Sequence, residues 1–273
     1  TLAFDFEWMN KALFYGAYSR ANSYFQNTEY AARDYPHADE LVLLAPMKAE
    51  LPPEVFTRVF EPPKSDGNGF DRDNLLKASN LLDDAGWVLK NRQRVNVQTG
   101  KPLSFELLIA SGANDQWVLP FKKNLARLGV TMNIRQVDMA QLTNRKRSRD
   151  YDMMQTLWAA QPWPSSDLQI SWASGYIDSS YNAPGVKSPV IDALIAKIVA
   201  AQGDKNKLLP LGRALDRVLT WNYYMLPMWY MGEDRVARWD KFSLPAVRPV
   251  YTLGFDTWWY DVNKAAKLPA ERR

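Results

Sequence analysis

A strand–helix–strand pattern in the middle of the chain restricts the fold more than any other feature. Leu103 to Ala110 predicts a strand, Gln116 to Leu128 predicts a helix, and Val130 to Val137 alternates apolar and polar residues as a second strand does. Pro120 fits this helix in its first turn. A unit of this length implies two parallel strands with a right-handed crossover, so we expect a mixed α/β fold.

The periodicity of the remaining sequence indicates further elements on both sides of this unit. We expect a hairpin over 87–100, one or two helical turns over 168–172, strands over 151–158, 224–231 and 235–239, and helices over 1–15, 71–86, 139–147, 190–201 and 205–221. Residues 17–70 hold several prolines between short apolar runs, so we expect a long irregular segment there, a feature that is often functional.

The stretch 150–167 combines a predicted strand with a loop rich in proline and tryptophan. Pro162 and Pro164 end regular structure because each lacks an N–H and fixes φ. Rigid loops at strand ends often carry binding groups. A packed strand end with two buried indoles is the alternative. The candidate binding groups are the flat faces of Trp158 and Trp163 and the polar side chains of Gln161, Ser165, Ser166 and Asp167.

The amino-acid composition limits the kinds of binding and catalytic sites that the chain can form. The 11 Trp and 13 Tyr residues suit a cleft that grips its ligand by flat surfaces, with Tyr176 and Tyr181 expected to be exposed. There is no Cys, which excludes disulfides and thiolate metal sites. The single His, His37, lies in a polar run, so we expect neither triad catalysis nor a histidine-based zinc site. We therefore predict no catalytic residues, no metal and no cofactor.

The formal net charge of +4 is spread along the chain, with one basic cluster from Arg145 to Arg149 at a predicted helix end. These cations either interact with the helix C-terminus or form a site for a carboxylate such as that of a peptide. Nucleic-acid binding would need longer basic runs, so we do not expect it.

No apolar run has the length of a membrane span. The chain starts at Thr1 inside a predicted helix, and we expect it to be a fragment or a processed piece.

Seven short motifs, each different, follow one another over nearly the whole chain. They are Leu2–Gly16, Leu81–Trp87 (LLDDAGW), Lys101–Leu107 (KPLSFEL), Leu125–Ile134 (LARLGVTMNI), Tyr151–Trp158, Ser188–Ile195 (SPVIDALI) and Leu226–Tyr230 (LPMWY). Together they resemble the oligopeptide-binding class of the family 5 extracellular solute-binding proteins, and within it the peptide-binding subunit of a peptide ABC importer of enteric bacteria.

The resemblance implies a two-lobed fold of the periplasmic binding protein type II kind. Residues 1–228 would be the second ligand-binding lobe, and residues 229–273 would return to a first lobe that this chain lacks. It further implies a non-enzymatic, periplasmic subunit that captures oligopeptides or peptide-like cargo. Its partners would be an ABC permease and its ATPase.

The resemblance also carries expectations for single residues. Lys146 and Arg147 match a basic segment near the carboxylate end of the peptide, and Trp158 matches a tryptophan that borders the cleft. Gln161 stands where some members hold the peptide's α-amino group with an Asp. A neutral amide cannot pair with an ammonium, so we expect Asp167, six residues further on, to substitute if the loop folds back.

Other functions remain open from the sequence. The same fold could bind another cargo, such as a nickel complex, an opine or a sugar. A carbohydrate-active enzyme would need two carboxylates facing each other across a cleft, which adjacency in sequence does not provide. A peptide-binding or chaperone-like module without transport is the third alternative.

Overall fold

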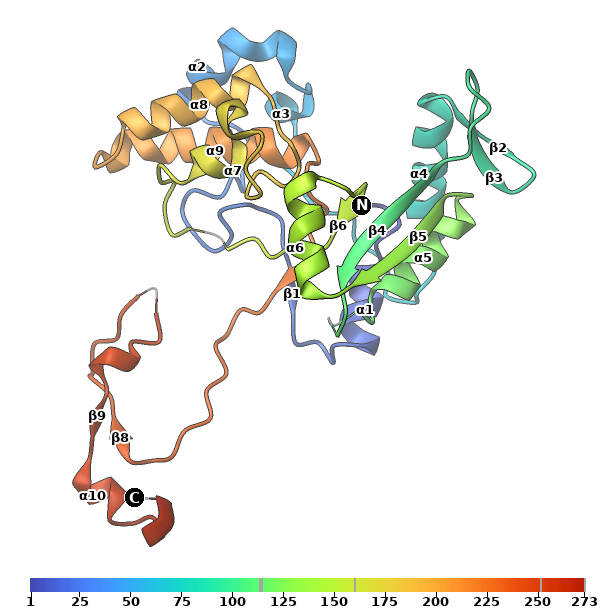
Figure 1. Ribbon diagram of the computed structural model, residues 1–273. Coiled ribbons are helices and arrows are strands. Elements are labelled where there is room, and N and C mark those ends of the chain that lie inside the picture. The colour runs from blue at the N-terminus through green and yellow to red at the C-terminus, as the bar shows by residue number, and fades with distance from the viewer. Residues whose placement is uncertain (113–114, 160, 251, 273) are drawn as a thin grey trace. The chain divides into compact units, whose positions relative to one another are not determined.

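Strands β4 (Ser104–Ala110) and β5 (Thr131–Val137) lie parallel and are joined by helix α5 (Val118–Arg127), which confirms the predicted crossover unit. Their register runs from Ser104 opposite Thr131 to Ala110 opposite Val137. The short strand β6 (Met153–Met154) pairs parallel with the other edge of β4, so the strand order is β5–β4–β6 (Figure 1).

The computed structural model describes residues 1–112, 115–159, 161–250 and 252–272. Ala160 in the predicted loop, and Tyr251 and Arg273 in the predicted C-terminal segment, lie outside the described residues. The chain divides into two compact units, Thr1–Tyr230 (unit 1) and Met231–Arg273 (unit 2).

Helix α4 (Arg72–Asp84) and the hairpin of β2 (Trp87–Lys90) and β3 (Gln93–Asn96) precede the sheet in unit 1, as predicted. Asp71 begins the helix by accepting a hydrogen bond from the Asn74 N–H at 2.8 Å. Asn91 and Arg92 turn the hairpin with φ of 50° and 66°, the backbone that a tight two-residue hairpin turn requires.

One hydrophobic cluster packs around the sheet. It joins α5, the core side of β4 and β5, and helix α1 (Phe6–Ala12). Phe4 is its aromatic centre, with ring centroids 5.7 Å from Phe121, 6.1 Å from Trp117 and 6.2 Å from Trp229. Residues from both ends of unit 1 therefore share this core.

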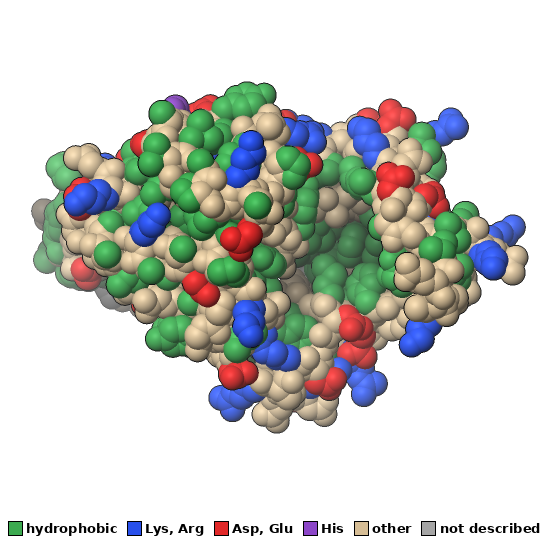
Figure 2. All heavy atoms as spheres, turned by 90° about the horizontal axis from the view of Figure 1, so that it is seen from above, with side chains coloured by type: hydrophobic (Ala, Val, Ile, Leu, Met, Phe, Trp, Pro, Cys, Tyr) green, Lys and Arg blue, Asp and Glu red, His purple; other side chains and the backbone are tan. Residues whose placement is uncertain are grey.

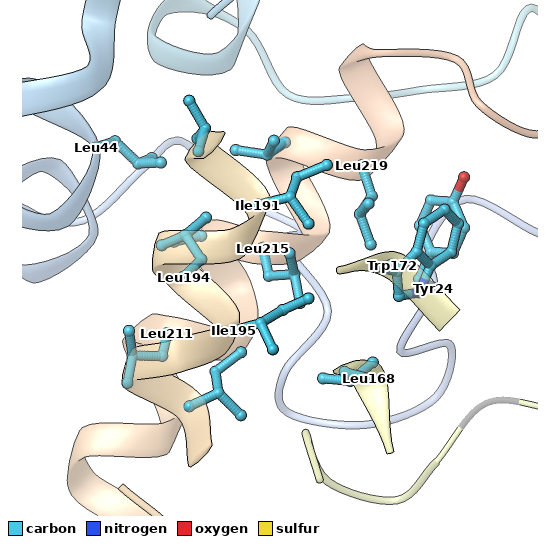
Figure 3. Packing of buried hydrophobic residues seen from close by; sticks show 14 of the residues in the cluster. Tyr24, Leu44, Leu168, Trp172, Ile191, Leu194, Ile195, Leu211, Leu215 and Leu219 are labelled. Carbon is cyan, nitrogen blue, oxygen red and sulfur yellow. The ribbon is translucent and has the colours of Figure 1, made fainter. Parts of the chain in front are cut away.

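A second hydrophobic cluster holds the helical part of unit 1. Its centre is the pair α8 (Pro189–Ala200) and α9 (Lys205–Trp221), both predicted, with α2 (Ala38–Leu44), α3 (Glu54–Thr57) and α7 (Leu168–Trp172) around them. Figure 3 shows the leucine and isoleucine side chains of α8 and α9 pointing toward one another, with Tyr24 and Trp172 closing one side. Ser188 caps α8 and Pro189 is its first residue, a position that proline favours because its missing N–H would have no partner there.

Helix α9 also holds a buried carboxylate. Asp216 is 1% exposed and accepts hydrogen bonds from Ser23 Oγ (2.8 Å), the Tyr24 N–H (2.8 Å) and the Ala32 N–H (2.9 Å). All three donors belong to the segment that precedes α2. The long connection over 23–32 is therefore tied to α9 by backbone and hydroxyl donors.

The next residue of α9 extends this attachment to α2. Arg217 and Glu40 are both buried, and Arg217 Nε lies 2.8 Å from Glu40 Oε2. Arg217 also donates to the Asp34 carbonyl at 2.5 Å. Because a buried charge is costly unless it is paired, the two ends of this pair specify how α2 seats on α9.

The predicted strand over 151–158 is wrong in its length. The Gln155 N–H still donates to the Leu108 carbonyl at 3.3 Å, and then the chain leaves the sheet. Leu157 is exposed to solvent, and Trp158 packs on the helical cluster instead. Burial in that cluster wins over continued strand pairing.

Other boundaries also differ from the expectations. The helix predicted over 1–15 begins after Asp5, whose carboxylate accepts from the Trp8 N–H at 3.0 Å, and α1 ends at Ala12. The segment 17–70 is not irregular throughout, since α2, α3 and η1 (Ala45–Glu50) lie within it.

Two predicted strands in the C-terminal part of the chain are wrong in length or existence. The strand over 224–231 shrinks to β7 (Trp229–Tyr230), because its partner β1 (Ser19–Arg20) offers two residues to pair with. Residues 235–239 form no strand.

Unit 2 consists of short elements. Strands β8 (Phe242–Ser243) and β9 (Trp259–Tyr260) pair antiparallel, with η3 (Phe255–Thr257), α10 (Val262–Ala265) and η4 (Ala270–Arg272). Several of its large apolar side chains are exposed: Val236, Trp239, Val247, Val250, Phe255, Trp259, Tyr260 and Val262. In the part of the chain that the structure describes, no helix is long and apolar enough to cross a membrane.

We expect Asp216→Ala to lower the free energy of unfolding by about 3–5 kcal/mol, because it leaves one buried donor and two partly buried donors without an acceptor. Urea denaturation followed by circular dichroism measures this loss. Asp178→Ala, at an exposed position of the same unit, is the matched control and should change the value by less than about 0.5 kcal/mol. Equal effects of the two substitutions would contradict the role given to Asp216.

Burial raises the pKa of Asp216 from its usual 3.8 to about 6, although its hydrogen bonds from Ala32, Tyr24 and Ser23 oppose the shift. The folded chain then binds a proton that the unfolded chain releases between about pH 4 and pH 6. This group's contribution to stability is therefore complete below about pH 4 and is lost as the pH rises through 6. The difference in unfolding free energy between the wild type and Asp216→Ala should grow on acidification from pH 7 to pH 4.5. A difference that stays constant would refute the shift.

Candidate functional site

The loop after β6 is anchored to the helical part of unit 1 at two points. At the first, Trp158 Nε1 donates to the Tyr24 carbonyl at 2.9 Å, and its ring lies 5.2 Å from Trp172 and 5.7 Å from Tyr24. The indole N–H, which could have served a ligand, is thus occupied by the protein. Trp158 is half-buried and belongs to the packing of the helical cluster.

The second anchor is Pro164. Its carbonyl accepts from Gln202 Nε2 at 3.0 Å, and it packs against Gly212 in α9. A Cβ at Gly212 would lie 3.1 Å from Pro164 Cγ and 2.9 Å from Tyr30 Cδ1, so the absence of a side chain there allows this close approach.

Between and after these anchors, the loop presents the other predicted ligand groups to solvent. Trp163 is 48% exposed, and Gln161 and Asp167 are exposed as well. Asp167 stands at the start of α7, but its carboxylate caps no N–H of that helix. The loop therefore offers an aromatic face, an amide and a carboxylate on a fixed support.

The second group of predicted ligand residues lies at the end of α6 (Met139–Ser148). Arg145 lies within this basic cluster, but its charge is neutralised within the protein. It pairs with Glu106 at 2.7 Å and with Asp150 at 2.9 Å, and the hydrogen bond to Asp150 is the main cause that raises the pKa of its guanidinium. Arg145 ties the end of α6 to β4.

The neighbouring cations are less engaged. Lys146 Nζ lies 6.0 Å from the centre of the Tyr181 ring, and Arg149 donates to the Ser179 carbonyl at 3.4 Å. Arg147 is exposed and has no hydrogen bond or ion pair among the described residues. Cations at the end of α6 thus face the 176–185 loop, which contributes the Tyr181 ring and the Ser179 carbonyl. Tyr176 and Tyr181 are 44% and 69% exposed, as expected.

The structure supports the two groups of predicted residues on different elements. Trp158, Gln161, Trp163 and Asp167 come from the loop on the helical part, while Lys146 and Arg147 come from α6 beside the sheet. Within the described residues, no hydrogen bond or ion pair joins one group to the other. Unit 1 is hollowed between its helical part and its sheet part, and hydrophobic side chains gather in the hollow (Figure 2).

The sequence analysis missed Arg20 in β1 as a candidate. Its guanidinium lies 4.6 Å from the centre of the Phe4 ring, and its nitrogen atoms are buried without a hydrogen-bond partner among the described residues. Burial lowers its pKa to about 10. No sequence pattern marks it, because its burial depends on β7, which pairs with β1 from far along the chain.

The single histidine and the acidic side chains take structural roles or stand apart from one another. His37 stands at the start of α2, where its N–H donates to Glu40 Oε1 at 3.3 Å. Across the described ranges, no three His, Cys, Asp or Glu side chains form a group that could hold a metal ion.

The chain matches a protein-family model and several known proteins. Residues 1–180 match the family model described as bacterial extracellular solute-binding proteins, family 5 middle. The chain is 75% identical over 270 residues to the "Uncharacterized protein YejA" of Escherichia coli K12, which covers 99% of this chain and 45% of that protein. It is 39% identical over 260 residues to the "Probable peptide-binding protein YejA" of Agrobacterium fabrum, with 94% and 42% covered. The chain therefore spans less than half the length of these relatives.

Solved structures share the fold at low sequence identity. The nickel-binding NikZ of Campylobacter jejuni, in complex with Ni(L-His), superposes with a TM-score of 0.59 at 12% identity, covering 84% of this chain and 40% of that one. The DppA protein of Helicobacter pylori, in complex with the peptide STSA, gives a TM-score of 0.55 at 14% identity, with 84% and 38% covered. These likenesses confirm the predicted mixed α/β fold as that of part of a solute-binding protein.

We expect Trp158→Phe to lower the free energy of unfolding by about 1–2 kcal/mol, because it leaves the Tyr24 carbonyl without its donor. Trp163→Phe, at the exposed position five residues on, should change it by less than about 0.5 kcal/mol. Urea titration of both variants distinguishes the two roles. If Trp163→Phe cost as much as Trp158→Phe, the division between a packed and a free indole would be wrong.

Proposed function

Because the chain belongs to the bacterial extracellular solute-binding proteins of family 5, we propose that it is part of a receptor that captures oligopeptides or peptide-like cargo in the periplasm. The receptor delivers this cargo to an ABC permease, whose ATPase subunits supply the energy for transport. The chain itself performs binding and no catalysis.

Two kinds of observation support a peptide as the cargo. The Agrobacterium relative is named a probable peptide-binding protein, and the Helicobacter neighbour holds a peptide. In this chain, exposed groups suited to both ends of a peptide stand on fixed supports. The observation that carries the proposal is that unit 1 presents an unpaired cation, Arg147, with Lys146 beside it on α6, and an unpaired carboxylate and an aromatic face on the 155–167 loop.

The proposed division of the chain rests on its resemblance to the family, and its coverage of less than half of each relative supports the division. Residues 1–228 form the second lobe of the receptor. Residues 229–273 begin with β7, which still packs in unit 1, and from Met231 on they return to a first lobe supplied by sequence outside this chain. The apolar side chains that unit 2 exposes support this view, because a soluble unit rarely leaves so many uncovered. A ligand held between two lobes gains water exclusion on closure, so this lobe alone binds weakly.

The residues have distinct proposed roles. Arg147, with Lys146 beside it, pairs with the carboxylate end of the peptide, since a charged donor binds a carboxylate more strongly than a neutral one does. Asp167 pairs with the α-amino end in place of Gln161, whose amide can accept a hydrogen bond but carries no charge. Trp163 supplies a flat contact, and Trp158 positions the loop from behind.

The test uses tryptophan fluorescence and short peptides of mixed sequence. The E. coli relative at full length and a chimera carrying this chain in place of its matching 270 residues should each show a saturable change, while this chain alone should show little. In the chimera, Arg147→Gln should weaken binding of peptides with a free carboxylate by about three- to tenfold and leave amidated peptides unchanged. Asp167→Asn should do the same for free-amino against acetylated peptides.

Arg135→Gln, at an exposed position of β5, is the matched control for charge and should leave all affinities unchanged. No fluorescence change in either full-length protein would contradict the peptide cargo and favour a nickel complex, an opine or a sugar. Binding that is insensitive to end blocking would contradict the roles of Arg147 and Asp167 while leaving the cargo class intact.

A further inference from the structure

A groove on the sheet side of unit 1 lies apart from the residues discussed above. It is lined by residues of α4, the β2–β3 hairpin and the end of α5, is open to solvent and has a volume of about 620 Å³. Three of its apolar side chains are largely open to solvent: Phe70 is 50% exposed, Leu76 57% and Leu89 55%. Single exposed apolar residues are common, but here three converge on one concave surface.

The floor of the groove is rigid because Arg94 fixes it. This side chain is 2% exposed and donates to the Leu128 carbonyl at 2.9 Å, the Trp87 carbonyl at 2.9 Å and Asp83 at 2.5 Å. It also hydrogen-bonds to Ser79. One buried cation thus joins the hairpin, α4 and the end of α5, so the groove exists before any partner arrives.

The rim carries positive charge and no lining carboxylate. Arg127 lies 4.5 Å from the centre of the Phe70 ring and donates to Asn124 Oδ1 at 2.6 Å and to the Gly69 carbonyl at 3.2 Å. It is held in place, yet exposed. Arg72 is also exposed and has no hydrogen bond or ion pair to any described residue. Of the acids close by in the chain, Asp83 pairs with Arg94 and Asp71 accepts hydrogen bonds from Asn74, while Asp73 is exposed and does not line the groove.

We propose that this groove is a docking site for an acidic amphipathic segment of a partner protein. Apolar side chains of the segment cover Phe70, Leu76 and Leu89, and its carboxylates pair with Arg72 and Arg127. Charge complementarity identifies the occupant. The groove combines apolar side chains with two guanidiniums at its rim, and an acidic amphipathic segment would match both. A helix that lays its apolar face into a groove is a known way for proteins to recognise one another.

The shape of the groove favours a protein segment over a small molecule. Small-molecule sites enclose most of their ligand, whereas the apolar side chains here stay half exposed. The docking site also stands apart from the proposed function, because none of the proposed ligand residues lines the groove.

The test uses this whole chain and a synthetic helical peptide with leucines on one face and glutamates flanking them, followed by isothermal titration calorimetry. We expect saturable binding that weakens as salt is added. Leu76→Ser combined with Leu89→Ser should weaken it about tenfold, and Arg72→Gln should weaken it about threefold. Leu81→Ser and Lys77→Gln, at exposed positions of α4 outside the groove, are the matched controls and should change nothing.

Several results would overturn the proposal. They are an affinity that the groove variants leave unchanged, equal binding of a peptide with glutamine in place of glutamate, and equal binding of octanoate, which would indicate a small aliphatic acid. Sedimentation that shows a dimer abolished by Leu76→Ser would identify a second copy of the chain as the occupant instead. None of these outcomes bears on the peptide titration of the full-length proteins, so the two proposals fail separately.

Discussion

The helical part of unit 1 depends on two charged residues placed side by side in α9. Asp216 draws the backbone of residues 23–32 onto the helix, and Arg217 draws in α2 through Glu40. A connection of that length has little regular structure to hold it, and its entropy must be offset by specific contacts. Buried charges meet this need because a misplaced partner leaves an unpaired charge in a dry interior. The hydrophobic cluster supplies cohesion, and this network supplies the alignment.

Specific contacts also hold the loop that carries the proposed ligand groups. Trp158 and Pro164 attach this loop to the helical part, where Gly212 allows a close approach, so the exposed side chains of the loop stand on an anchored backbone. The aromatic supply of the chain is divided accordingly. Trp117, Trp172 and Trp221 are buried in the two clusters, whereas Trp163 remains open. A high tryptophan content therefore reflects core packing as much as ligand contact, and the packed alternative considered for Trp158 and Trp163 holds for the first of them.

Cations in unit 1 serve in three different ways that their sequence positions do not reveal. Arg94 and Arg217 are buried and hold elements together, and Arg145 joins α6 to the sheet through Glu106. Arg72 and Arg147 are exposed and unpaired among the described residues, so their charge is available to another molecule. The distinction follows from burial and partners alone. It explains why one basic run, Arg145 to Arg149, contains both structural and candidate binding residues.

The sequence by itself determined the elements whose hydrophobic period and end residues agree. The crossover unit over 103–137, α4, and the long helices α8 and α9 were predicted because local propensity and packing favour the same structure there. The motifs also identified the family, since they extend over most of the chain. Tertiary structure alone decided the length of β6, the packing of Trp158 on the helical cluster and which cations remain free. Each of these depends on a partner distant in the chain, such as Tyr24 for Trp158 or Glu106 for Arg145, and a local pattern contains no information about contacts of that range.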